Sequence, residues 1–292
     1  MRKTLFLSLA LAAAAAASLP AAHQVGARAA GQAVPGKQAL AYGTDALQSL
    51  DYWPAADSGA PHVVFVHGGG WKRGDKDLVE GSPKLTHWHG RGYAVASVNY
   101  RLVPAATVEQ QAADIASATA FLRANAATLG FDPRRIVLVG HSAGAHLVAL
   151  VGTDPRWFRG AGLELDDVRG VVPLDGAAYD VARQLEIGAP VMGKTYRQTF
   201  GTDPDRHRGL SPTLQGAAPN APAFLIMHVQ RDDGTEQSRA LADALRKAGT
   251  QVEIHGFAGR GLRGHRQINR DLGEADYPAT PVLDRWLASV FG

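Results

Sequence analysis

Short apolar runs alternate with longer stretches of helical spacing along most of this chain. The runs lie at 62–66, 93–98, 135–139, 170–174, 223–227 and 252–257, and the helical stretches lie at 108–127, 143–151, 236–248 and 281–291. Most of the runs are rich in Val, Ile, Leu or Phe and do not alternate apolar with polar residues, which is typical of strands buried on both faces. The alternation of strand and helix predicts an α/β fold with a mostly parallel central sheet flanked by helices.

Two parts of the chain depart from this alternation of strand and helix. Two short strands near 38–42 and 47–52 are expected ahead of the first buried run, with a turn at Gly43-Thr44-Asp45. The stretch 176–222 is longer than an ordinary connection between two strands. We expect it to form a helical insertion over the carboxyl edge of the sheet, where it would wall a pocket.

The N-terminus has the layout of a secretory signal peptide. Arg2 and Lys3 precede an apolar run of mostly Leu and Ala over 5–19, and small residues follow. This run is short for a membrane span, which needs about 20 residues. An uncleaved anchor or an alanine-rich tail is the alternative interpretation.

The leader divides the chain into two parts. Residues 1–30 are predicted to be the signal peptide, with cleavage near Ala21 or Ala29, and residues 31–292 are predicted to form a single domain. We therefore expect a secreted or periplasmic protein with no stable membrane span after processing.

The charge balance is uneven along the chain. The formal net charge is +3, and Arg2, Lys3 and Arg28 account for all of it because the predicted leader contains no acid. The remainder is balanced, so the composition gives no reason to expect a nucleic-acid partner. The chain has no Cys, which excludes a disulfide framework, a thiolate metal site and a Cys nucleophile.

A serine lies at the most informative junction of strand and helix. The apolar run at 135–139 leads directly into Gly140-His141-Ser142-Ala143-Gly144, and a helical pattern follows. The Gly-x-Ser-x-Gly pattern in this context predicts a tight turn that exposes a nucleophilic Ser142 hydroxyl at the top of the sheet. The alternative is a small-residue turn that only packs a helix onto the sheet.

A glycine-rich loop follows the first buried run, at His67-Gly68-Gly69-Gly70-Trp71. Consecutive glycines after a strand let backbone N–H groups turn into a site without interference from side chains. We expect the N–H groups of Gly69, Gly70 and Ala143 to form an oxyanion hole. The spacing fits neither of the common phosphate-binding glycine patterns.

The two motifs together resemble a known family. The HGGGW stretch upstream of GHSAG is similar to the hormone-sensitive-lipase-like branch of the α/β-hydrolase fold, and especially to secreted esterases grouped with feruloyl and acetyl-xylan esterases and to arylformamidase-like hydrolases. Further stretches that fit are Asn99-Tyr100-Arg101-Leu102, 131–136 and Leu174-Asp175-Gly176. The resemblance covers roughly residues 38–290.

The resemblance implies a Ser-acid-His chain order. The acid is expected after the run at 223–227, in His228-Val229-Gln230-Arg231-Asp232-Asp233-Gly234, and the family's spacing from the histidine favours Asp232. Asp233 is the alternative. The residue that does not act as the acid would complement the dipole of the following helix.

The base is expected after the last strand. His265 follows a glycine-rich loop there, whereas its rival His255 lies inside the strand. The histidines near the serine are predicted to have other roles: the His141 side chain points elsewhere, and His146 is a buried, hydrogen-bonded core residue. His87 and His89 could suggest a metal pair, but without a third ligand we expect a solvated helix face.

The predicted activity is hydrolysis of a small-molecule carboxylic ester through an acyl-enzyme, without a metal or an organic cofactor. Trp71 and Tyr100, with the insertion at 176–222, are candidates for shaping the pocket. An arylformamidase-like hydrolase of amides or formamides is the second interpretation. The third is a binding protein without catalysis on a hydrolase scaffold.

Overall fold

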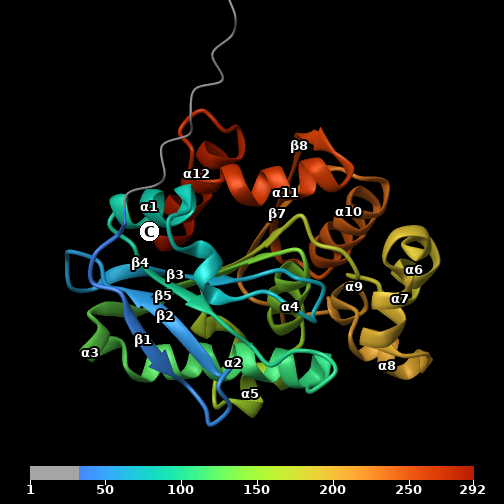
Figure 1. Ribbon diagram of the computed structural model, residues 1–292, viewed down its shortest axis with the longest axis horizontal. Helices are drawn as coiled ribbons and strands as arrows, with labels where there is room; N and C mark the ends of the chain where they lie inside the picture. Colours follow the sequence, from blue (N-terminus) through green and yellow to red (C-terminus); the bar gives the residue numbers. More distant parts are fainter. Residues whose placement is uncertain (1–32) are drawn as a thin grey trace, which may run out of the picture. The chain divides into compact units, whose positions relative to one another are not determined.

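Eight strands hydrogen-bond into one sheet in the order β1-β2-β4-β3-β5-β6-β7-β8 (Figure 1). The computed structural model describes residues 33–292. The strands are β1 (Gln38–Ala41), β2 (Ser49–Trp53), β3 (Ala60–Val66), β4 (Ala94–Val98), β5 (Phe131–His141), β6 (Gly170–Leu174), β7 (Ala223–Gln230) and β8 (Gln251–Arg260). All eight strands expected from the sequence are therefore present, with bounds that differ by a few residues.

The direction of the strands decides where a site can form. β1 pairs with β2 and β2 with β4 in antiparallel fashion, whereas the strands from β4 through β3 and β5 to β8 are parallel. In the central pair, Val63 lies beside Val137 and Val66 beside Gly140. The carboxyl ends of the parallel strands thus meet at one edge, which is where ligands bind in open α/β sheets.

Helices cover both faces of the sheet, which explains the uninterrupted apolar runs. Val64 and Val66 belong to the core on one face, and Val63 and Phe65 to the core on the other. The helices of the first face include α2 (Val108–Ala124), α3 (Ala126–Leu129), α4 (Ala143–Thr153), α5 (Pro155–Gly160) and α10 (Asp232–Lys247). The second face packs against α1 (Pro83–Gly90), α11 (Gly261–Asp271) and α12 (Ala279–Phe291) (Figure 1).

The stretch 176–222 forms the helical insertion that its length predicted. It contains α6 (Val181–Ile187), α7 (Ala189–Phe200), α8 (Pro204–Gly209) and α9 (Pro212–Gln215), which gather beside α4 and α10 (Figure 1). Two short 3-10 turns, η1 (Lys76–Val79) and η2 (Leu165–Asp167), complete the secondary structure of the described residues. Phe200 is fully buried, so the insertion is packed onto the core on the first face of the sheet.

The predicted leader at 1–30 lies outside the described residues. Within residues 33–292, no helix combines the length and the apolar character that crossing a membrane requires.

Candidate active site

Ser142 lies at the tight turn between β5 and α4, where the sequence motif predicted it. Its backbone has φ 58° and ψ −116°, a strained conformation for a residue with a side chain. A Cβ at Gly140 would collide with the Gly144 carbonyl, and one at Gly144 would collide with the carbonyls of Val66 and His67. Gly140 is therefore required because the turn folds closely onto itself, and Gly144 because the turn presses against the end of β3.

His265 contacts the serine. The Ser142 hydroxyl donates to His265 Nε2 at 3.0 Å, and the His265 side chain is only 13% exposed. The sequence predicted a glycine-rich loop here, but His265 lies in the second turn of α11, which begins directly after β8. A Cβ at Gly264 would come within 2.9 Å of Gly259 Cα, so these glycines let the helix fold back closely onto the end of the strand.

Asp175 is the carboxylate that contacts His265. His265 Nδ1–H donates to Asp175 Oδ2 at 2.6 Å, and the Val229 N–H donates to Asp175 Oδ1 at 3.0 Å. Asp175 follows β6 directly, has φ 46° and is fully buried. The Ser142 N–H in turn donates to the Leu174 carbonyl at 3.1 Å. The serine and the carboxylate are thus held by neighbouring strands of the sheet.

This arrangement corrects the sequence prediction for the acid. Asp232 is exposed and is the first residue of α10, two positions after β7 ends. Asp233 accepts a hydrogen bond from Gln184 at 3.1 Å and makes no contact with His265. The segment between β7 and α10 is too short to return a carboxylate over the sheet edge to His265. Both aspartates instead lie in the first turn of α10, where negative charge complements the helix dipole.

The Asp175 carboxylate stays ionised despite its burial. Burial alone would raise its pKa, but the hydrogen bond from His265 and the nearby Arg231 guanidinium outweigh that effect and hold the pKa below its usual range. Arg231 Nε lies 3.4 Å from Asp175 Oδ2, and Arg231 Nη2 donates to the Gly176 carbonyl at 2.9 Å. A charged acid beside the imidazole fixes the tautomer whose Nε2 can accept a proton.

The glycine loop after β3 lies against Ser142. Gly69 and Gly70 have φ values of 135° and 63°, which only glycine adopts readily. A Cβ at Gly68 would come within 2.9 Å of both Ser142 Cβ and the His141 carbonyl. Within residues 33–292, neither Gly69 N–H nor Gly70 N–H donates to another backbone or side-chain acceptor. Both donors therefore remain available to a ligand.

The loop is held from behind. The Tyr100 hydroxyl donates to the His67 carbonyl at 2.9 Å, and the two rings stack with centroids 4.5 Å apart. The Trp71 carbonyl accepts from the Val103 N–H at 2.9 Å and from Gln111 Nε2 at 2.8 Å. Tyr100 thus supports the loop from the core, whereas Trp71 itself lines the cavity in front of Ser142.

Comparisons with known proteins support this fold. A family model described as BD-FAE matches residues 50–162, which span the glycine loop and the Ser142 turn. The crystal structure of esterase B from Lactobacillus rhamnosis superposes with a TM-score of 0.73 at 21% identity, over 89% of this chain and 88% of that one. The chain has the α/β-hydrolase fold. Esterase 2 of Thermogutta terrifontis, solved with butyrate bound, superposes on this chain with a TM-score of 0.67 at 24% identity, over 88% of this chain and 95% of that one.

A curated esterase is also similar to this chain in sequence. Esterase LipC of Mycobacterium tuberculosis is 31% identical over 226 residues, which are 72% of this chain and 55% of that protein. The chain spans about half the length of the first curated relatives it matches.

The two histidines beside Ser142 do not bond with its hydroxyl. His146 is fully buried and confirmed as a core residue: its Nε2–H donates to the Leu210 carbonyl at 2.9 Å, and its Nδ1 accepts from Trp71 Nε1 at 3.3 Å. His141 is closer to Ser142 and His265 than expected. Its Nε2–H donates to the His265 carbonyl at 3.1 Å and its ring lies 4.6 Å from the His265 ring. His141 therefore ties the Ser142 turn to α11.

The remaining histidines have structural contacts. His255 is half-exposed on β8, with Nε2 3.3 Å from Glu253 Oε2. His87 contacts Asp284 of α12 at 2.8 Å, and His89 bonds to the Pro54 carbonyl at 3.0 Å. The expectation of a solvated helix face is thus wrong in detail, because both side chains of the His-Trp-His stretch are engaged in packing α1.

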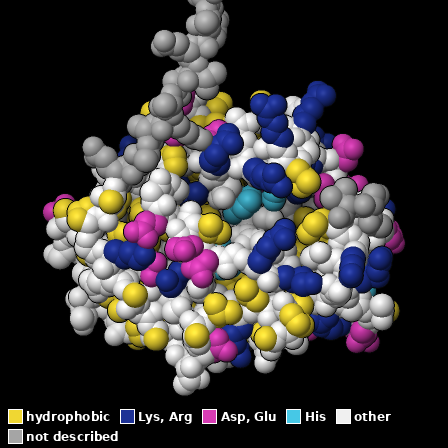
Figure 2. Space-filling view, in the orientation of Figure 1, with side chains coloured by type: hydrophobic (Ala, Val, Ile, Leu, Met, Phe, Trp, Pro, Cys, Tyr) yellow, Lys and Arg dark blue, Asp and Glu magenta, His cyan; other side chains and the backbone are white. Residues whose placement is uncertain are grey.

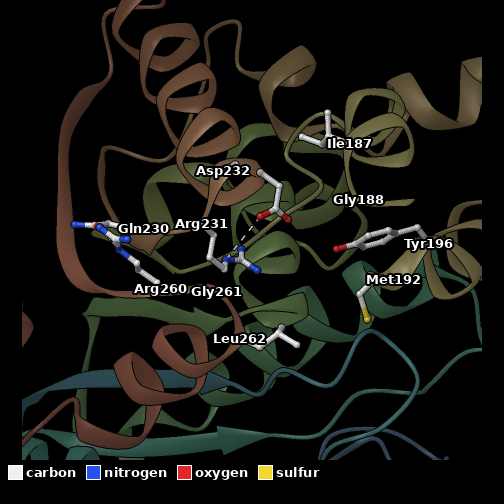
Figure 3. A pocket seen from close by; sticks show the side chains of 11 residues that line it. Ile187, Gly188, Met192, Tyr196, Gln230, Arg231, Asp232, Arg260, Gly261 and Leu262 are labelled. Carbon is white, nitrogen blue, oxygen red and sulfur yellow. Dashed lines mark hydrogen bonds and ion pairs between the residues drawn. The ribbon is translucent and has the colours of Figure 1, made fainter. Parts of the chain in front are cut away.

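Two adjoining cavities open at the carboxyl edge of the sheet. The first has a volume of about 410 Å³ and is lined by Ser142, His265 and the glycine loop. The second has a volume of about 480 Å³ and lies between α7 and the start of α10. Figure 3 shows the Arg231 side chain pointing into the second cavity between Gln230 and Tyr196. The residues that line both cavities are Met192, Tyr196, Arg231 and Leu262.

Proposed function

We propose that this chain is a serine carboxylesterase that cleaves esters of small molecules through an acyl-enzyme. The observation that carries the proposal is the continuous hydrogen-bonded series from Ser142 through His265 to Asp175, beside a glycine loop with free N–H groups. A serine hydroxyl is a weak nucleophile on its own, and an adjacent base oriented by a third group is the usual means of activating it. We assign Ser142 as the nucleophile, His265 as the base and Asp175 as the group that orients the base.

The first half of the reaction forms the acyl-enzyme. Ser142 Oγ bonds to the ester carbonyl carbon while its proton moves to His265 Nε2, and the carbonyl electron pair moves onto oxygen. The N–H groups of Gly69, Gly70 and Ala143 stabilise that oxyanion; losing one such donor in a well-studied protease costs about 10²–10³ in rate. The tetrahedral species then expels the alcohol, which takes the proton from His265.

The second half returns the enzyme to its starting state. Water attacks the acyl carbon while His265 Nε2 accepts one of its protons, and the carboxylic acid leaves as Ser142 Oγ regains a proton. Asp175 stays ionised throughout and stabilises the imidazolium that forms twice in the cycle. Besides the ester and water, these steps use side chains and backbone groups of this chain.

The names of similar proteins support this class of substrate. Esterase LipC and the two esterases with known structures are named for ester hydrolysis, and the Thermogutta structure carries butyrate. Butyrate is a short acyl group, and a cavity of about 410 Å³ beside Ser142 has room for one. We also propose export from the cytoplasm, because the sequence of residues 1–30 has the layout of a signal peptide.

The function is tested by comparing an ester with a formamide. We expect the native protein to hydrolyse p-nitrophenyl butyrate and to be labelled by a fluorophosphonate, and we expect Ser142→Ala to lose both properties while staying folded by circular dichroism. N-formylkynurenine is the competing substrate. Faster turnover of the formamide than of the ester would favour an arylformamidase-like activity, and absence of turnover and labelling in the native protein would reject an enzyme.

A small change behind Ser142 tests the glycine loop. Gly68→Ala is expected to lower kcat/KM for p-nitrophenyl butyrate by about 10²-fold, because the new methyl would push the loop and the serine apart and small misplacements have costs of this size. The matched control is Gly90→Ala at the end of α1, where an added Cβ meets nothing within 4 Å. Equal activity of the two variants would show that the loop does not need its close approach to Ser142.

A further inference from the structure

The charged residues that line the cavity at Ser142 all carry one sign. They are Arg73, Arg231 and Arg266, and no Asp or Glu is among the lining residues. Arg231 is 10% exposed and is already engaged with Asp175 and the Gly176 carbonyl. Arg73 and Arg266 are exposed at the mouth. These two side chains are therefore the charges that an entering molecule meets first.

Both exposed arginines are attached to parts of the reaction centre. Arg73 follows the glycine loop, and a Cβ at Gly69 would collide with the Arg73 carbonyl. Arg266 is the residue after His265 in α11. Their backbones are therefore fixed relative to Ser142, although their guanidinium groups reach into solvent.

Both guanidinium groups lack a partner in the described part of the chain. Within residues 33–292, Arg73 and Arg266 make no side-chain hydrogen bond and no ion pair, whereas the exposed Arg134 and Arg183 are paired with carboxylates. The nearest acid along the chain, Asp75, caps η1 and accepts from Asn99 at 3.1 Å. Figure 2 shows Lys and Arg gathered around the histidine surface in the middle of this face, with Asp and Glu clustered apart from it.

This concentration of positive charge is local. The basic and acidic residues of 31–292 balance, because the net charge of +3 comes from Arg2, Lys3 and Arg28. A cleft that collects one sign of charge in a neutral protein raises the local concentration of molecules of the opposite sign. The bidentate geometry of a guanidinium also matches a carboxylate well.

Apolar side chains complete the mouth. Leu78 and Leu262 line the same cavity with exposed fractions of 63% and 51%. They are two of the three exposed large hydrophobic residues in the described part of the chain. The mouth therefore offers apolar contact between positive charges, which suits a molecule with a hydrocarbon body and an anionic end.

We propose that the preferred esters carry an ionised carboxylate in addition to the ester group, with Arg73 and Arg266 as the residues that select it. This inference rests on the proposed esterase activity and narrows its substrate class. The carboxylate can belong to the acyl part or to the alcohol part of the ester, since Ser142, Arg73 and Arg266 line one cavity.

Matched pairs of substrates test the selection. For the acyl side we compare monomethyl adipate with methyl hexanoate, and for the alcohol side 4-acetoxybenzoate with its methyl ester. In at least one pair, the native protein should favour the anionic member in kcat/KM by about 10-fold at about 0.01 M salt. The preference should shrink at about 0.5 M salt, where charges are screened over a few ångströms.

The variants identify the residues responsible. Arg73→Gln and Arg266→Gln should each lower the ratio of anionic to neutral kcat/KM by about 3-fold, as expected for an exposed charge pair, and the double variant by about 10-fold. Arg134→Gln is the control, since Arg134 is exposed in the first half of β5, away from the carboxyl edge. Its ratio should match that of the native protein.

Three results would overturn the inference without touching the esterase assignment. One is a ratio of unity in both pairs while neutral esters are hydrolysed and Ser142→Ala is inactive. Another is a preference that Arg73→Gln and Arg266→Gln leave intact. The last is an anionic-to-neutral ratio of unity in kcat/KM together with stronger activation by phosphatidylglycerol vesicles than by phosphatidylcholine vesicles. That result would make the mouth a surface for anionic lipid.

Discussion

Replacing Asp175 with Asn is expected to lower kcat/KM for p-nitrophenyl butyrate by about 10⁴-fold, the size of the effect that the same change of the acid has in a serine protease. The Asp175 carboxylate accepts from two donors, His265 Nδ1–H and the Val229 N–H. An amide in its place offers one oxygen and one NH₂ group. If the NH₂ group faces His265, the imidazole is held with its proton on Nε2, and it then lacks the lone pair that Ser142 needs.

Asp232 and Asp233 are the two aspartates to compare with Asp175. Asp232→Asn and Asp233→Asn should each change kcat/KM by less than about 3-fold, because neither carboxylate contacts His265 and an exposed charge near a site has a small effect. All three variants need to be folded at the assay temperature, as judged by thermal melting. Collapse of activity in Asp232→Asn with activity retained in Asp175→Asn would return the role of the acid to the segment after β7.

The second large effect concerns stability in acid. Two histidines are fully buried with environments that disfavour their charged forms. Burial lowers the pKa of His62 to about 3 and that of His146 to about 4, and for His146 the bond to the Leu210 carbonyl offsets only part of the shift. His62 lies against Phe131 and Tyr52, with ring centroids 4.2 and 5.5 Å away, and neither of its ring nitrogens has a hydrogen-bond partner in the described residues.

Because of these lowered pKa values, the folded protein loses stability as the pH falls. Below about pH 6.5 the unfolded chain binds a proton at each histidine, whereas the folded protein does not until the pH approaches the lowered value. The free energy of unfolding should therefore fall as the pH drops from about 6.5 to about 4, by on the order of 3 kcal/mol for each of the two histidines. His141 adds to the loss, since burial and the nearby His265 hold its pKa well below the usual value.

Urea unfolding at pH 7.5 and pH 5 measures this dependence. His62→Phe keeps an aromatic ring beside Phe131 and removes the titrating group, so it should flatten the slope by up to about 1.4 kcal/mol per pH unit. His255→Gln, a change of a half-exposed side chain on β8, is the control. If His62→Phe and the native protein lose stability in parallel between these pH values, burial of His62 is not a source of acid lability.

The fold could be predicted from the chain because its signals are local and agree with one another. The buried runs around His62 and Phe224 have the composition of strands covered on both faces, and the Ser142 motif stands between a strand and a helix. α11 was missed because Gly261 and Gly264 are typical of loops. Its stability comes from tertiary packing, with Ile268 fully buried in the core on the second face, and tertiary packing overrides helix propensity.

The wrong prediction of Asp232 as the acid has a similar origin. Asp232 stands at the spacing that the family resemblance favoured, but spacing along the chain does not say how far a segment reaches in space. Asp175 carried its own signal, a lone carboxylate immediately after the buried strand that follows the Ser142 helix. The geometric argument that parallel strands end at one edge applies to β6 as much as to β7, and only the strand order places β6 next to β5.

When the acid follows β7, one segment both supplies the acid and lines the cavity at the start of α10. The position of Asp175 after β6 separates these two roles. In this protein the proposed chemistry depends on the loop after β3, on β5 and β6 and on α11, whereas Asp232 lines the adjoining cavity and not the one at Ser142. Substitutions of Asp232 can therefore reshape the adjoining cavity without removing a reacting group. For laboratory evolution, this makes Asp232 a tolerant place to introduce diversity, since the catalytic cost of a poor choice there is expected to be small.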